Sequence, residues 1–196
     1  MKKYDVFIVT KPLQYLNATN ISTLNKKNCL LVNNFKDANL IYKKISELSN
    51  YWSSVFYFEK SADAYLWVIK NKGMVENLYI DSDYGVQKHF YLVRLYKHIN
   101  IFVYEEGIGN YKGNLNNNSF IGNLKKTFNS LLGNKDFLGG SKYVKGIFLY
   151  DCHKHRIVYP NSNKKLFHFD KSFLNHISDF SDSLFFSSRS EVSSSM

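Results

Sequence analysis

Two adjacent carboxylates, Glu105 and Glu106, are the residues of this chain best placed to do chemistry. They follow the apolar run at 99–103, which is typical of a buried strand. Successive strand side chains point to opposite sides, so one carboxylate can face a ligand. Two nearby carboxylates raise each other's pKa, which suits one of them to act as a general base. Gly107 and Gly109 let the backbone turn sharply and a ligand approach. Taken alone, this motif is more typical of a solvated acidic turn.

A second polar segment follows the first predicted strand, where the chain reads Thr10-Lys11-Pro12-Leu13-Gln14-Tyr15-Leu16-Asn17. It joins that strand to a helix, and such a turn presents backbone N–H groups to an anion. The glycine fingerprint of a dinucleotide site is absent. The amides of Gln14 and Asn17 can bond sugar hydroxyls, although each residue alone is equally suited to cap or solvate the helix.

A third polar segment, Asp81-Ser82-Asp83, follows another apolar run. Alternating carboxylates can bind a divalent metal, but the full calcium-loop pattern is missing. We therefore predict that Ser82 or Asp83 caps the following helix. Cys152 with the nearby histidines lacks metal-ligand spacing, and Cys29 lies in an apolar run that is typical of a buried position. No metal site is predicted.

These segments are positioned by a regular alternation of strand and helix patterns. Short apolar runs predict strands at 4–10, 29–32, 55–58, 75–80 and 100–104. Amphipathic spacing predicts helices at 13–24, 37–48, 62–70 and 87–98. Such alternation with short connections indicates an α/β fold, with a parallel sheet covered by helices on both faces. The three polar segments then lie at the carboxyl edge of the sheet, where ligands bind in open α/β proteins.

The rest of the chain has a less regular pattern. We predict a polar loop at 113–118, an amphipathic helix at 120–132, a linker at 133–143, short strands at 147–150 and 156–159, and a short helix at 173–177. From residue 178 the sequence is rich in serine, a composition typical of a flexible tail.

The net charge of +10 indicates an anionic partner for part of the surface. The lysines are scattered singly and in pairs, without a basic block or a nucleic-acid-reading motif, so nucleic acid is not the expected partner. Most of them fit a solvated surface, and an anionic membrane face or ligand is the better specific interpretation. With no signal peptide and no apolar segment near the ~20 residues that span a bilayer, we expect a cytoplasmic protein that contacts the inner membrane face peripherally.

The turn at 12–18, Pro-Leu-Gln-Tyr-x-Asn-Ala, and the segment at 105–111, Glu-Glu-Gly-Ile-Gly-Asn-Tyr, together resemble the N-terminal half of bacterial sialyltransferases. The similarity covers residues 1–150, is greatest to the lipooligosaccharide sialyltransferases of glycosyltransferase family 52, and extends to the polysialyltransferase motif. It implies a Rossmann-like domain forming half of a GT-B enzyme, without metal or cofactor. The enzyme would transfer sialic acid from CMP-sialic acid, with inversion, to a glycan or glycolipid of capsule, lipooligosaccharide or O-antigen.

The resemblance assigns roles to individual residues. Glu105 aligns with the catalytic base, and Glu106 orients or tunes it. The acceptor lies at the same edge, against the residues Thr10, Lys11, Gln14, Asn17, Gly107 and Gly109.

The chain departs from the family at the donor side. Members carry a His-Pro pair that contacts the CMP phosphate, whereas the prolines here follow Lys11 and Tyr159. We expect an acceptor-binding, catalytic-base domain at 1–138, a linker and truncated start of a second domain at 139–177, and a flexible tail at 178–196. Such a chain can be inactive alone or form a homodimer. The alternatives are a non-catalytic acceptor-binding remnant and a transferase with a different nucleotide-sugar donor.

Overall fold

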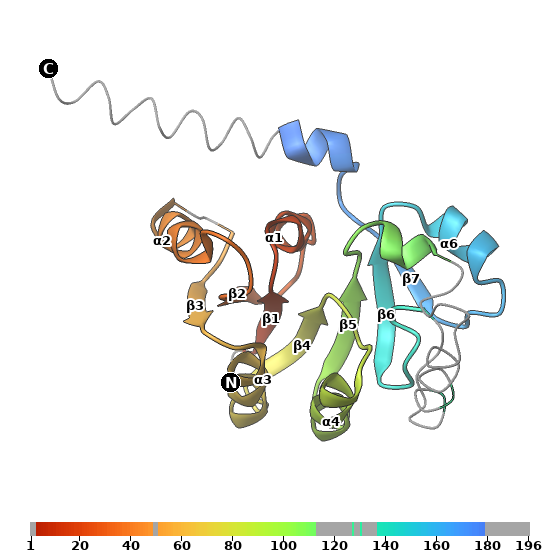
Figure 1. Ribbon diagram of the computed structural model, residues 1–196, viewed down its shortest axis with the longest axis horizontal. Coiled ribbons are helices and arrows are strands. Elements are labelled where there is room, and N and C mark those ends of the chain that lie inside the picture. Colours follow the sequence, from red (N-terminus) through yellow and green to blue (C-terminus); the bar gives the residue numbers. More distant parts are fainter. Residues whose placement is uncertain (1–2, 49–50, 113–126, 128–129, 131–136, 179–196) are drawn as a thin grey trace, which may run out of the picture.

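A computed structural model of the chain describes residues 3–48, 51–112, 127, 130 and 137–178. Its centre is a seven-stranded sheet in the order β3-β2-β1-β4-β5-β6-β7 (Figure 1). Every neighbouring pair of strands is parallel. The predicted α/β class is therefore confirmed, and the domain is Rossmann-like.

The elements follow one another in βα units. The strands are β1 (Tyr4–Val9), β2 (Lys26–Val32), β3 (Ser54–Phe58), β4 (Val75–Ile80), β5 (Asn100–Tyr104), β6 (Val144–Leu149) and β7 (Lys165–His168). The α-helices are α1 (Pro12–Thr19), α2 (Ala38–Leu48), α3 (Ser61–Lys70), α4 (Val86–Leu95) and α6 (Cys152–Val158), with a 3₁₀ helix, η1 (Ile108–Tyr111). Residues 173–178 are also helical.

The direction in which the strands are added reverses beside β1. The chain builds β1, β2 and β3 towards one edge, then returns to place β4 on the other side of β1. Because parallel crossovers are right-handed, helices before and after this return lie on opposite faces, as Figure 1 shows for α1 and α2 against α3 and α4. Each face buries an apolar cluster, one around Phe7 and Val9 and the other around Val6 and Ile8.

Residues 139–177, which we expected to hold a linker and the start of a second domain, contribute β6 and β7 to this same sheet, with α6 connecting the two strands. The strand predicted at 156–159 is wrong, because α6 occupies most of it. The Asp151 carboxylate accepts the Lys154 N–H (2.8 Å) and so caps that helix. The strand predicted at 147–150 and the helix at 173–177 are found close to their expected positions. β7 was not predicted.

Some predicted features lie outside the described residues: the polar loop at 113–118, nearly all of the helix at 120–132, and all but the first residue of the serine-rich tail. Cys29 and Cys152 are both buried free thiols. None of the described helices combines the length and apolar character needed to cross a lipid bilayer.

The C-terminal end of α1 is closed by a partly buried lysine from β2. Lys27 Nζ donates to the carbonyls of Ala18 (2.9 Å) and Ile21 (2.8 Å). It also lies 4.8 Å and 4.9 Å from the ring centroids of Phe7 and Trp52. The carbonyls and rings favour the charged ammonium, but burial outweighs them and lowers the pKa of Lys27 to about 8.

This pKa predicts a pH-dependent stability. The folded pKa lies below the ordinary lysine value of 10.5, so between about pH 8 and 10.5 the unfolded chain binds the extra proton. Raising the pH through that range therefore stabilises the wild type relative to Lys27→Met. Urea unfolding of both proteins from pH 7.5 to 9.5 measures this difference. Lys26→Met is the control for net charge, and a difference independent of pH would contradict the prediction.

Candidate functional site

The carboxyl ends of β1, β4, β5 and β6 bring the predicted polar segments together. Asn17 Nδ2 donates to the Glu105 backbone carbonyl (2.7 Å), and Gln14 Nε2 donates to Asp81 Oδ2 (3.2 Å). Lys11 forms an ion pair with Glu106. The segments converge because β1 and β4 are neighbours at the point where the strand order reverses, the usual ligand site of such sheets.

Glu105 is the centre of this edge. Its side chain is buried, and Oε2 accepts hydrogen bonds from the Tyr111 hydroxyl (2.5 Å) and the Tyr150 backbone N–H (2.9 Å). Oε1 accepts no hydrogen bond from the described residues. Burial raises the pKa of Glu105 more than these two bonds lower it. The carboxylate is thus held by one oxygen and keeps the other available for a proton.

Two tyrosines that we had not assigned to the site hold Glu105 in place. The Tyr111 hydroxyl also accepts the Asp151 backbone N–H (3.0 Å). The Tyr150 hydroxyl donates to Asn17 Oδ1 (2.8 Å). Burial and the neighbouring carboxylate raise the pKa of Tyr111, so it remains a donor at neutral pH. The sequence signal for Tyr150 was its place at the end of the strand predicted at 147–150.

The two carboxylates do not act on each other as predicted. Glu106 turns towards Lys11, and its backbone N–H donates to Asn110 Oδ1 (3.1 Å). The pKa of Glu105 is raised by burial and by Asp151, against the lowering effect of its hydrogen bonds. Opposite orientation of successive side chains therefore separates their roles, and Glu106 is the more exposed of the two.

The glycines of the motif differ in conformation. Gly107 has φ +126°, a backbone angle that residues with a side chain rarely adopt, and it starts the sharp turn into η1. Gly109 lies within η1 without positive φ, in contact distance of Leu138, where a Cβ would be 3.7 Å from Cδ1. The expected sharp bend therefore depends on Gly107.

Gln14 and Asn17, expected to face the acceptor, are 0% and 1% exposed. Gln14 Oε1 accepts both the N–H (2.7 Å) and the hydroxyl (2.9 Å) of Thr10. Their amide groups thus tie β1 and α1 to the ends of β4 and β5. In this structure they position the edge of the sheet, while Lys11 is the exposed one of the four residues expected to bind the acceptor there.

The Asp81–Asp83 segment does not cap α4, so that prediction is wrong. The N-cap residue is Gly85, at φ +106°, and no side chain bonds there. Asp83 instead accepts the backbone N–H groups of Gly139 (2.8 Å) and Ser141 (2.7 Å), which fastens the loop before β6. Asp81 pairs with Lys88 (2.9 Å). In the described part of the chain, no three His, Cys, Asp or Glu side chains are grouped to hold a metal ion.

Positive charge lies on both sides of Glu105. Lys11 is about half exposed, and Lys154 Nζ lies 5.3 Å from the centroid of the Tyr111 ring. Lys154 also lowers the pKa of Glu105, against the effect of burial. An anionic ligand is therefore compatible with this edge although it contains two carboxylates.

Together these features define a Rossmann-like α/β protein with a fixed, buried carboxylate at the carboxyl edge of its sheet. No protein family model, curated protein or solved structure matches the chain.

Proposed function

We propose that this chain is the acceptor-binding, catalytic-base domain of an inverting glycosyltransferase of bacterial surface-glycan synthesis, similar to sialyltransferases. The observation that carries the proposal is the state of Glu105. One oxygen is fixed by Tyr111 and Tyr150, the other has no donor among the described residues, and burial raises the pKa. A general base needs this combination of fixed orientation, an available lone pair and a pKa nearer to neutrality.

In the proposed reaction, Glu105 Oε1 takes the proton of an acceptor hydroxyl. The oxygen of that hydroxyl attacks C2 of sialic acid, and CMP leaves with the electron pair of the broken C2–O bond. Inversion follows because the attack comes from the side opposite CMP. Holding the acceptor hydroxyl against Oε1 brings the reacting groups together and allows the proton to be removed. Lys11 and Lys154 offset negative charge near this edge of the sheet.

The donor contact is proposed to come from groups outside this domain. The sequence has no His-Pro pair, and this observation also favours the second candidate, a different nucleotide-sugar donor. The acceptor is proposed to be a membrane-linked glycan, because a basic surface is attracted to anionic lipids.

Calorimetric titration of the folded chain separates these candidates. We titrate CMP, CMP-sialic acid, UDP-N-acetylglucosamine and a lipooligosaccharide-derived oligosaccharide. We expect the wild type to bind the oligosaccharide. In Lys11→Ala the affinity should fall about tenfold, because roughly one charged contact to the ligand is lost. Binding of CMP supports a sialic acid donor, and binding of UDP-N-acetylglucosamine supports the second candidate. A folded protein that binds neither the oligosaccharide nor any nucleotide overturns the proposal.

A further inference from the structure

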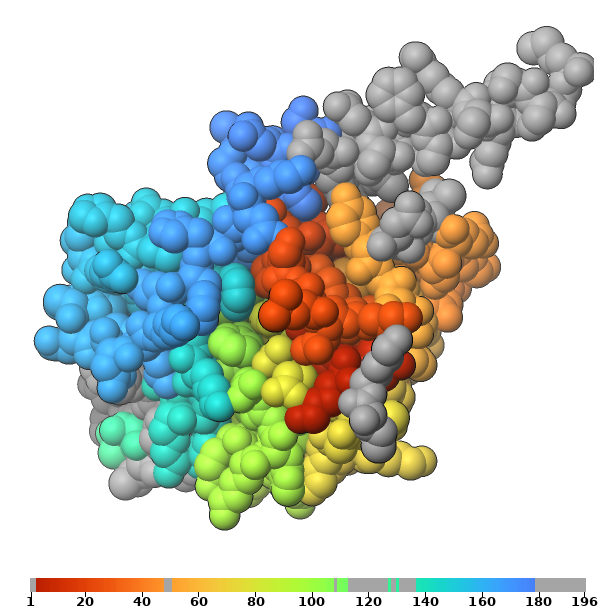
Figure 2. Space-filling view, turned by 180° about the vertical axis from the view of Figure 1, so that it is seen from behind, coloured from red at the N-terminus to blue at the C-terminus, as the bar shows by residue number. Residues whose placement is uncertain are grey.

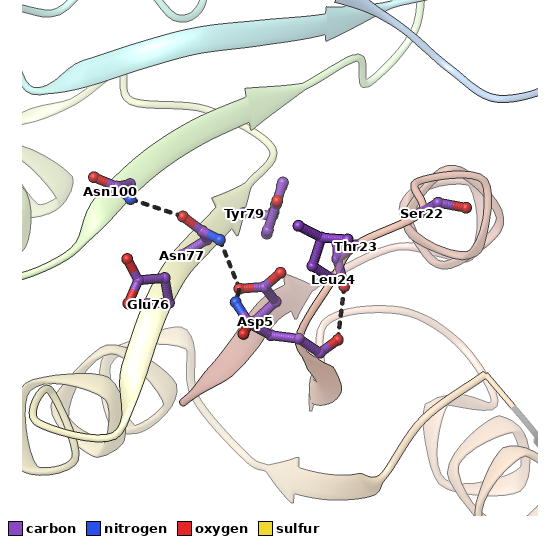
Figure 3. A pocket seen from close by; sticks show the side chains of 9 residues that line it. Asp5, Ser22, Thr23, Leu24, Glu76, Asn77, Tyr79 and Asn100 are labelled. Atoms are coloured by element: carbon purple, nitrogen blue, oxygen red, sulfur yellow. Dashed lines mark hydrogen bonds between the residues drawn. The ribbon is translucent and has the colours of Figure 1, made fainter. Parts of the chain in front are cut away.

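A second polar site lies at the amino ends of β1, β4 and β5, at the opposite edge of the sheet from Glu105. It is a pocket of about 500 Å³ between these strand ends and the loop at 22–25 that follows α1 (Figure 3). Asp5 and Thr10 are five strand residues apart, so the two sites are separated by roughly 16 Å. The volume falls within the range of small-ligand sites.

The side chains at the base of the pocket form one hydrogen-bonded chain. Asn100 Nδ2 donates to Asn77 Oδ1 (2.9 Å), and Asn77 Nδ2 donates to Asp5 Oδ1 (2.7 Å). Asn25 Nδ2 donates to the same oxygen (3.0 Å) from the loop. Figure 3 shows the side chains of Asp5, Asn77 and Asn100 meeting from three neighbouring strands.

This arrangement leaves acceptors without protein donors. Asp5 Oδ2, Asn25 Oδ1 and Asn100 Oδ1 accept no hydrogen bond from the described residues. Asp5 is only 1% exposed, and the amides of Asn25 and Asn77 hold its side chain in place. The network fixes their orientation before any ligand arrives, so the pocket is suited to a neutral molecule with several hydroxyl donors.

The charges of the lining argue against anions and metal ions. Among the described residues, those that line the pocket include two carboxylates, Asp5 and Glu76, and no lysine, arginine or histidine. Glu76 pairs with Lys3 (2.5 Å), and Asp5 Oδ1 already accepts two amide N–H groups. A phosphate or carboxylate ligand would meet the carboxylate of Asp5 without a cationic lining residue to pair with, and a cation would find little carboxylate left to coordinate it.

Apolar surface accompanies the polar groups. Leu24, which lines the pocket, is fully exposed. Below it lies Tyr79, whose ring is stacked between Phe7 (4.2 Å) and Phe102 (5.3 Å) and is therefore fixed. A pyranose ring likewise combines polar and apolar surface, with hydroxyl groups at its rim and C–H groups on its face.

We propose that this pocket binds a neutral saccharide unit. Sugar hydroxyls donate to Asp5 Oδ2, Asn25 Oδ1 and Asn100 Oδ1, and the C–H face of the ring packs on Leu24. The site is separate from the Glu105 edge and does not depend on the transferase proposal.

Saturation-transfer NMR of the whole chain tests the site with three neutral probes, lactose, cellobiose and N-acetylglucosamine, and with two anionic probes, CMP and a methyl sialoside. We expect transfer to at least one neutral probe, and binding about tenfold weaker in Asn100→Ala and in Leu24→Ala, the loss of one polar or one apolar contact. Leu24 is fully exposed, so its replacement leaves the fold intact. Leu66→Ala, an exposed leucine of α3, is the matched control and should bind like the wild type.

Other outcomes overturn the assignment. Absence of transfer from every neutral probe to the folded protein would do so, as would transfer only from CMP or a methyl sialoside. Binding that survives Asn100→Ala and Leu24→Ala but is lost in Lys11→Ala would place the sugar at the Glu105 edge. That result would remove this pocket as a site while leaving the transferase proposal standing.

Discussion

Replacing Glu105 by glutamine is expected to reduce glycosyl transfer by about 10²- to 10⁴-fold, the usual contribution of a positioned general base. The amide occupies the same volume and can still accept the Tyr150 N–H, so the geometry of the edge is retained. It cannot take a proton from an acceptor hydroxyl. The measurement is the initial rate of transfer to the acceptor under the donor conditions that the titrations identify, compared with the wild type.

The same substitution should not lower stability at neutral pH. Burial raises the pKa of Glu105 in the folded state, so the folded chain holds that proton more strongly than the unfolded chain does. The stability this group contributes is complete below its unfolded pKa and is lost as the pH rises through the raised folded value. Glu105→Gln removes this pH dependence of stability. Urea unfolding at pH 4.5 and pH 7 should therefore show that the free energy of unfolding changes less with pH in the variant than in the wild type, and that the variant is no less stable at pH 7.

The matched control is Glu47→Gln, which removes an exposed carboxylate on α2 and should change neither rate nor stability appreciably. A Glu105→Gln protein with full transfer activity would exclude Glu105 as the base. A strong loss of stability at pH 7 would show instead that the carboxylate is structural. A loss of transfer activity without a loss of stability is typical of a functional group whose surroundings disfavour its charged form.

Much of the fold could be predicted because its signals are local. A strand buried on both faces needs a continuous apolar run, as in β5, and a helix that covers it needs spaced apolar residues, as in α2. Once the order is a repeated βα unit, the carboxyl ends of the strands must share an edge. The meeting of the segment after β1 with the segment after β5 follows from that alone.

The contacts that define the site could not be predicted, because they join distant parts of the chain. Tyr150 reaches Glu105 across 45 positions, and nothing local marks that pairing. Asp83 illustrates the same limit. A short carboxylate between a strand and a helix can bond the helix N–H groups or another loop, and only tertiary structure brings Gly139 and Ser141 to it.

The local patterns were also ambiguous at the C-terminal side of the sheet. Residues 156–159, Arg-Ile-Val-Tyr, have the β-branched and aromatic side chains of a strand. The structure makes most of them helical, because Asp151 caps α6 and because Cys152, His155 and Tyr159 bury one side of it at helical spacing. β7 has only four residues at the edge of the sheet, too few to show a clear alternation of apolar and polar side chains.

The loop held by Asp83 gives the largest expected effect on stability, through Gly139→Ala. Gly139 has φ +84°, and a Cβ there would lie 2.6 Å from Cγ1 of Ile147. Ile147 is 0% exposed, so it has no free space to move into. Backbone strain of about 1–3 kcal/mol and overpacking of about 1–3 kcal/mol then add, and we expect a loss of roughly 2–6 kcal/mol by urea unfolding.

Gly85→Ala separates the two causes. Gly85 also has positive φ, +106°, but a Cβ there meets no atom within 4 Å. It should lose only the strain, about 1–3 kcal/mol, and the difference between the two variants measures the collision with Ile147. If both variants lost the same stability, Ile147 would have rotated away and the loop would be less tightly held than its hydrogen bonds indicate. If Gly139→Ala alone is severe, Asp83 fastens this loop in a place where only glycine fits.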